Sequence, residues 1–170
     1  MKNLLLKSEF FDRQAIVDRG REVIRIEATA LAELEASLNG DFTAACEAIY
    51  ATRRQLVVTG MGKSGHIGRK VAATFAATGT PSVFIHPAEA AHGDLGIVAS
   101  GDVLLVFSNS GNTAELRAIL DYARSLEVPI IGVAAQGASL LMERADIGIR
   151  LPKLREVSVV RTFGADRGLD

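Results

Sequence analysis

The spacing of apolar residues along the chain changes near residue 54. From Asp12 to about Leu38, apolar positions recur at spacings near three, four and seven with Arg and Glu between them, a pattern typical of an amphipathic helix. Asn39-Gly40 ends this segment, and 43–53 reads as a second helix. Residues 1–54 are therefore predicted to be an N-terminal helical segment that packs on the core of the protein.

Beyond residue 54, short apolar runs alternate with longer periodic ones. Strands are expected at 55–59, 82–86, 102–107, 128–134 and 147–150, and helices at 64–78, 113–126 and 138–144. Strands that alternate with helices predict βαβ units. The expected fold is α/β: a three-layer, doubly wound, five-stranded parallel sheet of flavodoxin-like topology, preceded by the long helix. Ligands of such sheets bind at the carboxyl ends of the strands.

Composition narrows the class of protein. Hydrophobic residues make up 48% of the chain and aromatic ones 5%, which suits a parallel sheet buried on both faces. Lys plus Arg number 19 and Asp plus Glu 20, so no basic face points to nucleic acid as a partner. Cys46 is the single cysteine, which excludes an internal disulfide and favours a cytoplasmic location. The apolar stretch 128–135 is far short of the roughly 20 residues that span a membrane, so no membrane partner is expected.

A glycine-rich loop follows the first predicted strand. Gly60-Met-Gly62-Lys-Ser-Gly65 formally matches the dinucleotide fingerprint, but no acidic residue stands where the ribose hydroxyls would need one. It also imitates a P-loop, yet Val57 occupies the position of that motif's first glycine. An anion site remains, built from Gly62, Lys63 and Ser64 at a helix start. The alternative is that the glycines only make a tight turn from strand to helix.

A second polar loop follows the third predicted strand. Ser108-Asn109-Ser110-Gly111 leads through Asn112 to Thr113. Three hydroxyls and a glycine at a helix start can bind phosphate oxygens through side chains and backbone N–H groups together. The alternative is ordinary N-capping by Ser110 or Thr113.

These segments together resemble the SIS (sugar isomerase) domain family, and within it the D-arabinose 5-phosphate isomerases. The resemblance rests on Gly60-Met-Gly-Lys-Ser-Gly-His-Ile-Gly68, on His86-Pro-Ala-Glu-Ala-Ala-His-Gly-Asp-Leu-Gly96 and on Ser108-Asn-Ser-Gly111. It implies a five-stranded parallel sheet, a phosphate held by the serine-rich loop, and a homo-oligomer, a tetramer in the family, with sites shared between subunits.

The resemblance also implies roles for individual residues. It places Lys63, His92, Glu115 and Glu156 as the catalytic polar groups around the sugar. It places Gly62, Ser64 and His86, with Ser108, Asn109, Ser110, Gly111 and Thr113, at the bound substrate. Asn112 stands where relatives often carry an acid. The bland alternatives are a turn-capping role for His92 and a favourable first-turn acid for Glu115. His66, His86, His92 and Glu89 lack tight ligand spacing, so we expect neither a metal nor another cofactor.

The expected activity is interconversion of D-ribulose 5-phosphate and D-arabinose 5-phosphate through an enediol. The resemblance places this reaction on the route to the octulosonate sugar of bacterial lipopolysaccharide. The first alternative is a non-catalytic module that binds a sugar phosphate as a sensor. A nucleotide-binding module is disfavoured, since the ribose acid and the Walker glycine are both missing.

The resemblance is expected to end near Glu156. The domain is thus predicted at 55–156, and 157–170 as an irregular tail. Relatives continue into a further helix and a His-Pro-Gly-Gly segment, which this sequence lacks. The expectation is a truncated chain, with a frameshift as one origin and impaired isomerisation as the consequence.

Overall fold

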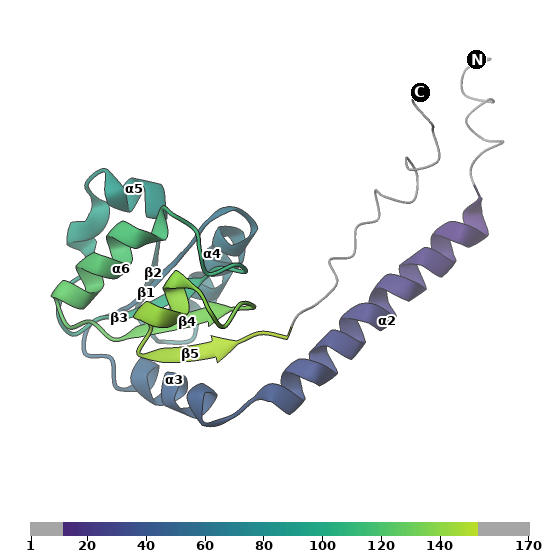
Figure 1. The fold of residues 1–170 in the computed structure, drawn as a ribbon, viewed down its shortest axis with the longest axis horizontal. Coiled ribbons are helices and arrows are strands. Elements are labelled where there is room, and N and C mark those ends of the chain that lie inside the picture. The colour runs from purple at the N-terminus through teal and green to yellow at the C-terminus, as the bar shows by residue number, and fades with distance from the viewer. Residues whose placement is uncertain (1–11, 153–170) are drawn as a thin grey trace, which may run out of the picture. The chain divides into compact units, whose positions relative to one another are not determined.

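A long helix precedes the sheet. The structure, a computed structural model, describes residues 12–152, which divide into one unit up to Ala36 and another from Ser37 onwards. Helix α2 (Arg13–Ser37) makes up the first unit (Figure 1). The helix predicted from Asp12 to Leu38 is therefore confirmed.

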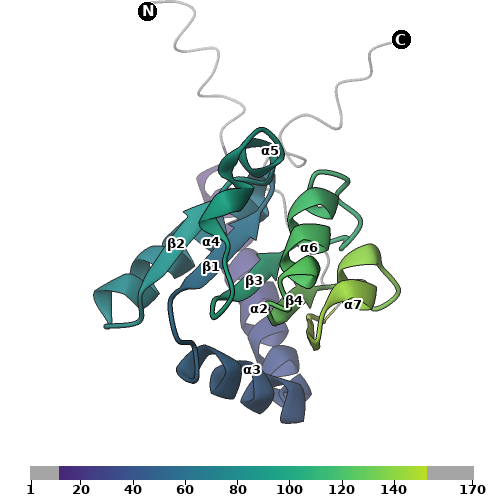
Figure 2. The same ribbon diagram turned by 90° about the vertical axis from the view of Figure 1, so that its left-hand side faces the viewer.

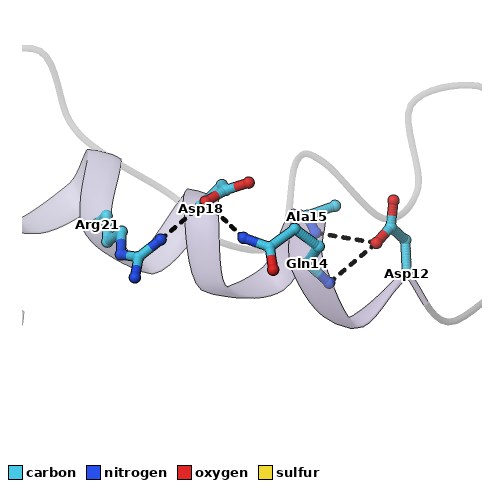
Figure 3. A network of polar contacts seen from close by, with 5 residues as sticks. All are labelled: Asp12, Gln14, Ala15, Asp18 and Arg21. Carbon is cyan, nitrogen blue, oxygen red and sulfur yellow. Dashed lines mark hydrogen bonds and ion pairs between the residues drawn. The ribbon is translucent and has the colours of Figure 1, made fainter.

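Polar side chains start and stabilise α2. The Asp12 Oδ1 atom accepts hydrogen bonds from the backbone N–H groups of Gln14, at 2.9 Å, and Ala15, at 3.0 Å. One turn on, the Asp18 carboxylate accepts from the Gln14 amide and binds Arg21 (Figure 3). An N-cap of this kind satisfies N–H groups that have no partner inside the helix, which explains why the helix begins here.

The second unit is built on five parallel strands in the order β2-β1-β3-β4-β5. The strands are β1 (Leu56–Gly60), β2 (Ser82–Ile85), β3 (Val103–Phe107), β4 (Ile130–Ala134) and β5 (Ile147–Arg150). The strand order reverses direction between β1 and β3, because β2 lies on one side of β1 and all later strands lie on the other. This is the predicted doubly wound sheet.

Helices cover both faces of the sheet (Figure 2). α3 (Gly40–Tyr50) and α4 (Gly62–Ala77) pack on one face, and α5 (Pro87–Ala91), α6 (Leu116–Ser125) and α7 (Leu140–Arg144) on the other. The short 3-10 helix η1 (Asp94–Ile97) follows α5. No helix within residues 12–152 is both long and apolar enough to cross a membrane.

Alternation along the strands divides the core between the two faces. Val57, Leu104 and Ile130 contact α6 and α7, whereas their strand neighbours Leu56 and Ile131 pack on the side of α3 and α4. Successive side chains of a strand point to opposite faces, so a strand covered on both sides must be apolar throughout. This accounts for the unbroken apolar runs of the central strands.

Several local features differ from the sequence-based expectation. The second helix, expected at 43–53, begins at Gly40 and ends at Tyr50, because the Asn39 side chain caps it by accepting from Asp41 N–H. The segment from Pro87 to Ile97 forms α5 and η1, where no helix was predicted. Helix α6 begins at Leu116 rather than at Thr113, because residues 113–115 form a tighter turn in which Leu116 N–H bonds Thr113 O and Arg117 N–H bonds Ala114 O. The expected helix at 113–126 is therefore shorter at its start.

Candidate functional site

The two loops singled out in the sequence lie side by side at one edge of the sheet. Gly60, which ends β1, is paired in register with Phe107, which ends β3. The segments that follow these two strands therefore begin next to each other, at the point where the strand order reverses. Parallel sheets bind their ligands at such points.

The β1–α4 loop brings backbone atoms into close contact. A Cβ atom on Gly60 would lie 2.9 Å from Phe107 O and 3.2 Å from the carbonyl carbon and oxygen of Ser64. Gly62 differs, because it has a φ of 54° and its missing Cβ would meet nothing within 4 Å. Gly60 therefore serves packing, whereas Gly62 provides the left-handed backbone that opens α4.

The start of α4 faces this edge without a side-chain cap. Met61 occupies the N-cap position and makes no capping hydrogen bond through its side chain. The exposed Lys63 and the half-buried Ser64 are the second and third residues of the helix. First-turn N–H groups, the positive end of the helix dipole and a lysine together favour an anion here.

The β3–α6 loop is held in shape by its own side chains. The Ser108 hydroxyl, whose residue is 4% exposed, accepts from Gly111 N–H at 3.1 Å. Ser108 Oγ also shares a 3.0 Å hydrogen bond with Thr113 Oγ1. Ser110 Oγ accepts from Asn112 N–H at 3.2 Å, and Gly111 has a φ of 67°. The hydroxyls thus hold the backbone in a turn around the glycine.

These contacts show that the capping alternative was wrong. Glu115 occupies the N-cap position of α6 and makes no side-chain capping bond, and the hydroxyls of Ser110 and Thr113 are used inside the loop. One hydrogen bond joins Ser108 to Thr113, so one of their two hydroxyl protons remains for a ligand.

Several backbone donors of this loop are left unused. Five backbone N–H groups between β3 and α6 donate no hydrogen bond within residues 12–152. They are those of Asn109, Ser110, Thr113, Ala114 and Glu115. Neighbouring N–H groups without partners at a helix start form a concave anion site. The loop can therefore surround a phosphate group with donors.

Two of the three histidines lie at the two ends of α5, and His66 lies within α4. His86 directly follows β2, and its Nδ1 atom accepts from Ala88 N–H at 3.3 Å, an arrangement that places the proton of the neutral ring on Nε2. His92 ends α5 and is exposed. Helix α5 packs against α6, so His92 belongs to the helical layer that also contains Glu115.

The remaining expected groups are less constrained. Glu115 is exposed directly before α6, and within residues 12–152 neither its side chain nor that of His92 forms a hydrogen bond or an ion pair. The predicted Glu156 lies outside the described residues. Among residues 12–152 no three His, Cys, Asp or Glu side chains are grouped as a metal site requires.

The structure adds three residues that the site prediction did not include. Asn112 accepts from Leu140 N–H through its side-chain oxygen at 3.0 Å. Ser139 is buried and caps α7; a serine at the start of a predicted helix was the available signal. Arg150 ends β5, and its guanidinium carbon would lie 3.5 Å from a Cβ on Gly137, in the loop after β4. No local pattern identified Arg150.

A groove of about 390 Å³ lies at the opposite end of the strands. Arg53, Arg54, Gly101 and Glu127 are among the residues that line it. These residues precede β1 and β3 or follow α6, so the groove is at the amino edge of the sheet. We place the candidate site at the carboxyl edge instead, because the unused N–H groups and the hydroxyls are there.

Comparison with known proteins identifies related sequences. A model of the SIS domain family matches residues 49–165, which extends past Glu156. The arabinose 5-phosphate isomerase KdsD of Escherichia coli K12 is 46% identical over 156 residues, covering 92% of this chain and 46% of the relative. KdsD of Francisella tularensis is 41% identical over 138 residues, covering 79% of this chain and 42% of the relative. The chain spans about half the length of the curated relatives it matches.

Solved structures share the fold. The Escherichia coli CFT073 protein c3406 in complex with arabinose 5-phosphate is 35% identical, with a TM-score of 0.82 over 88% of this chain and 80% of that one. A phosphoheptose isomerase from Francisella tularensis is 19% identical, with a TM-score of 0.68 over 81% of this chain and 85% of that one. At that identity the second likeness shows the fold alone.

Proposed function

The chain belongs to the SIS domain family, and from this premise we propose that it is the sugar-phosphate-binding domain of an arabinose 5-phosphate isomerase. The substrates are D-ribulose 5-phosphate and D-arabinose 5-phosphate. The observation that carries the proposal is the loop from Ser108 to Thr113, whose unused N–H groups adjoin the start of α4 where the strand order reverses. The similarity to KdsD and to a protein complexed with arabinose 5-phosphate supports the choice of sugar.

The phosphate group binds between the two loops in this proposal. Its oxygens accept hydrogen bonds from the N–H groups of Asn109 and Ser110 and from the remaining hydroxyl proton of the Ser108–Thr113 pair. Hydrogen bonds to a charged group contribute about 1.5–3 kcal/mol each. Gly62 lets the start of α4 approach the same ligand, and Lys63 adds a positive charge.

Isomerisation moves one proton between two carbons of the open-chain sugar. A base removes a proton from C1 of the ketose, the C–H electrons form the C1=C2 enediol, and an acid protonates the oxygen on C2. The oxygen on C1 then loses its proton, and C2 gains one, which gives the aldose. No net electron transfer occurs, so the reaction requires a base, an acid and a donor for the developing oxyanion.

The exposed polar groups at the carboxyl edge suit these tasks. We assign Lys63 to the oxyanion, because an ammonium group at a helix start stabilises negative charge without itself being consumed. His92 and Glu115 supply proton transfer in this proposal, together with Glu156. His86 donates through Nε2 to a sugar hydroxyl, because its Nδ1 atom is occupied by Ala88 N–H.

Assembly of several copies is part of the proposal. Helix α2 has no buried residue, and Val17, Ile24 and Leu31 recur on it every seventh position with exposed fractions of 48%, 67% and 66%. Apolar residues at this spacing are typical of a helix that packs against another helix. A second copy of the chain is the proposed partner of this stripe.

The test is conversion of D-ribulose 5-phosphate in D₂O, followed by proton NMR. We expect D-arabinose 5-phosphate to form with deuterium at C2, since the enediol takes its proton from a group that exchanges with solvent. Calorimetric titration with D-arabinose 5-phosphate measures binding separately. Lys63→Met should lower turnover about 10²–10⁴-fold, the usual contribution of a positioned catalytic group. Lys70→Met, on the same helix, is the matched control and should not.

Three outcomes separate the alternatives. Turnover with deuterium incorporation supports the isomerase. Binding without turnover supports the non-catalytic sugar-phosphate module instead. Absence of both binding and turnover would overturn the proposed function.

A further inference from the structure

The start of α7 is bound to the β3–α6 loop. Leu141 N–H donates to Gly111 O at 2.9 Å, and Leu140 N–H donates to Asn112 Oδ1 at 3.0 Å. These donors are in the first turn of α7, where N–H groups have no partner inside the helix. The loop supplies the acceptors, so α7 and the loop fix each other's position.

The end of β4 continues the same contact. Ser108 N–H donates to Val133 O at 3.0 Å, and Ala135 N–H donates to Asn109 O, also at 3.0 Å. Ser139 completes the contact, because a Cβ atom on Gly111 would lie 2.6 Å from Ser139 Cβ. Only glycine allows this approach. The loop is thus held along one side by the segment from Val133 to Leu141.

Apart from Ser108 N–H, these contacts use acceptors of the loop and leave its donors unused. The carbonyl oxygen of Asn109 accepts from Ala135 N–H, directly after β4, and the carbonyl oxygen of Gly111 and the side-chain oxygen of Asn112 accept from the start of α7. The N–H groups of Asn109 and Ser110, by contrast, have no partner within residues 12–152. An anion is repelled by exposed carbonyl oxygens and attracted by N–H groups. Because these oxygens already accept hydrogen bonds from neighbouring segments, the loop offers a ligand mainly N–H groups, which suits a phosphate.

We propose that Asn112 is a positioning residue for the β3–α6 loop and that it acts through its contact with α7. Its side-chain oxygen accepts from the N–H group of Leu140, 28 residues further along the chain. This contact keeps the loop in the conformation in which the N–H groups of Asn109 and Ser110 are available to a ligand. This inference rests on the proposed function, because it assumes that the loop binds the substrate phosphate. In this role the side-chain oxygen of Asn112 does not contact the phosphate, because it accepts the hydrogen bond from Leu140 N–H.

The central variant is Asn112→Ala, which removes the acceptor from an exposed position and leaves the core intact. Hydrogen exchange of the Leu140 amide, measured by NMR without ligand, should become faster. The KM for D-ribulose 5-phosphate and the Kd for D-arabinose 5-phosphate should rise about 3–10-fold, as expected for loss of one ordinary hydrogen bond. The kcat value should stay unchanged, since a phosphate distant from the reacting carbons is bound equally in ground and transition states.

Asn112→Asp separates position from charge. The carboxylate keeps an acceptor for Leu140 N–H, so slow exchange of that amide should be retained. Its negative charge beside the phosphate should weaken binding, and this deficit should shrink as salt is added, because exposed charges are screened. The deficit of Asn112→Ala, which has no charge, should not shrink in this way.

Asn39→Ala is the matched control. The Asn39 side chain accepts from Asp41 N–H at 2.9 Å at the start of α3, a contact of the same kind on the opposite face of the sheet from α6 and α7. Its loss should lower stability by a similar amount and leave the KM and Kd values unchanged.

The results distinguish a failure of the positioning role of Asn112 from a failure of the proposed function. If Asn112→Ala binds the sugar phosphate as tightly as the wild type, or if Leu140 exchanges at the wild-type rate in that variant, the positioning role is wrong. If the wild type binds no sugar phosphate, the proposed function fails, and the positioning role for phosphate binding fails with it. Leu140 exchange then still shows whether Asn112 fixes the loop.

Discussion

A Cβ atom on Gly65 would lie 2.6 Å from the carbonyl oxygen of Gly60. The first turn of α4 therefore rests directly on the last residue of β1, backbone against backbone. A Cβ on Gly68, one turn later, would lie 3.0 Å from the Phe84 ring. The glycines of the Gly60–Gly68 segment thus set how closely α4 approaches the sheet, and hence where the start of α4 lies relative to the neighbouring loop.

Gly65→Ala should destabilise the protein. The new methyl group meets backbone rather than a flexible side chain, so α4 must move away from β1, and overpacking of this kind costs about 1–3 kcal/mol. Urea unfolding followed by circular dichroism measures the change. Gly40→Ala is the control, because its Cβ would meet nothing within 4 Å. Gly40 is the first residue of α3, so this change should not destabilise the protein. Equal midpoints for the two variants would contradict the packing role.

Replacement of the loop serines should affect charged ligands selectively. The Ser110 hydroxyl accepts from Asn112 N–H and so keeps its own proton to donate to a phosphate oxygen. Ser108→Ala and Ser110→Ala should each weaken D-arabinose 5-phosphate binding by about 1.5–3 kcal/mol, the usual contribution of a hydrogen bond to a charged group. Binding of free D-arabinose should change little. Ser125→Ala is the control, since its hydroxyl bonds Tyr122 O at the far end of α6. An equal loss for sugar and sugar phosphate would show that this loop does not hold the phosphate.

The strands and long helices of the sheet domain could be predicted because each one has a recognisable pattern of apolar residues within its own short segment. Each central strand is an apolar run buried on both faces, and helix α6 buries Leu116, Ile119 and Leu120 at helical spacing. The short helix α5 was missed because His86-Pro87 has the composition of a turn, although the proline occupies a favoured first helical position. A five-residue helix is too short for its period to be recognised.

The candidate site was predictable in its residue types but not in its contacts. Two polar loops after strands were enough to place Ser108 and Lys63 at the same edge. The start of α6 at Leu116 reflects the turn at 113–115, and the Ser108–Thr113 hydrogen bond joins side chains five residues apart, which a capping rule does not contain. The contact of Asn112 with Leu140 spans 28 residues, so no local pattern reports it.

Asp102 should contribute to the stability of the fold and not to sugar-phosphate binding. Its residue is 1% exposed at the amino end of β3. The carboxylate accepts from Ala99 N–H at 2.8 Å, Gln55 N–H at 3.3 Å and Arg54 Nη1 at 3.1 Å. Asp102→Ala removes the acceptor of two partly buried N–H groups and of the exposed Arg54 side chain, and a hydrogen bond to a charged group contributes about 1.5–3 kcal/mol. We expect a lower urea midpoint and, at temperatures where the variant is folded, an unchanged Kd for D-arabinose 5-phosphate.

Asp121→Ala is the comparison for that variant. Asp121 forms an ion pair with Arg144, and both side chains are well exposed. Exposed pairs contribute about 0–1 kcal/mol, so this replacement should have a much smaller effect. If both aspartates proved equally dispensable, the buried network around Asp102 would not be what holds β3 to the segment before β1.

The apolar stripe of α2 should control assembly. Ile24→Glu places a charge among Val17, Ile24 and Leu31, and burial of an unpaired charge between helices is strongly unfavourable. We expect at least a dimer for the wild type and a lower mass for the variant by light scattering at micromolar concentration. Glu22→Gln, on the same helix, should retain the wild-type mass. A monomeric wild type would remove the basis for the proposed partner.

The strand order also governs how the chain can fold while it is being synthesised. β1 and β2 can pair as soon as β2 has emerged, and β3 then adds to the free edge of β1. β4 adds to β3, and β5 adds to β4, so no late strand has to enter between two strands already joined. From β3 onwards, each new strand pairs with the backbone groups of the strand that forms the growing edge, first β1, then β3, then β4. Growth therefore proceeds at one edge of the sheet, while β2 remains the strand at the other edge. The unpaired backbone groups of the growing edge are where an incomplete sheet can pair with other nascent chains and aggregate.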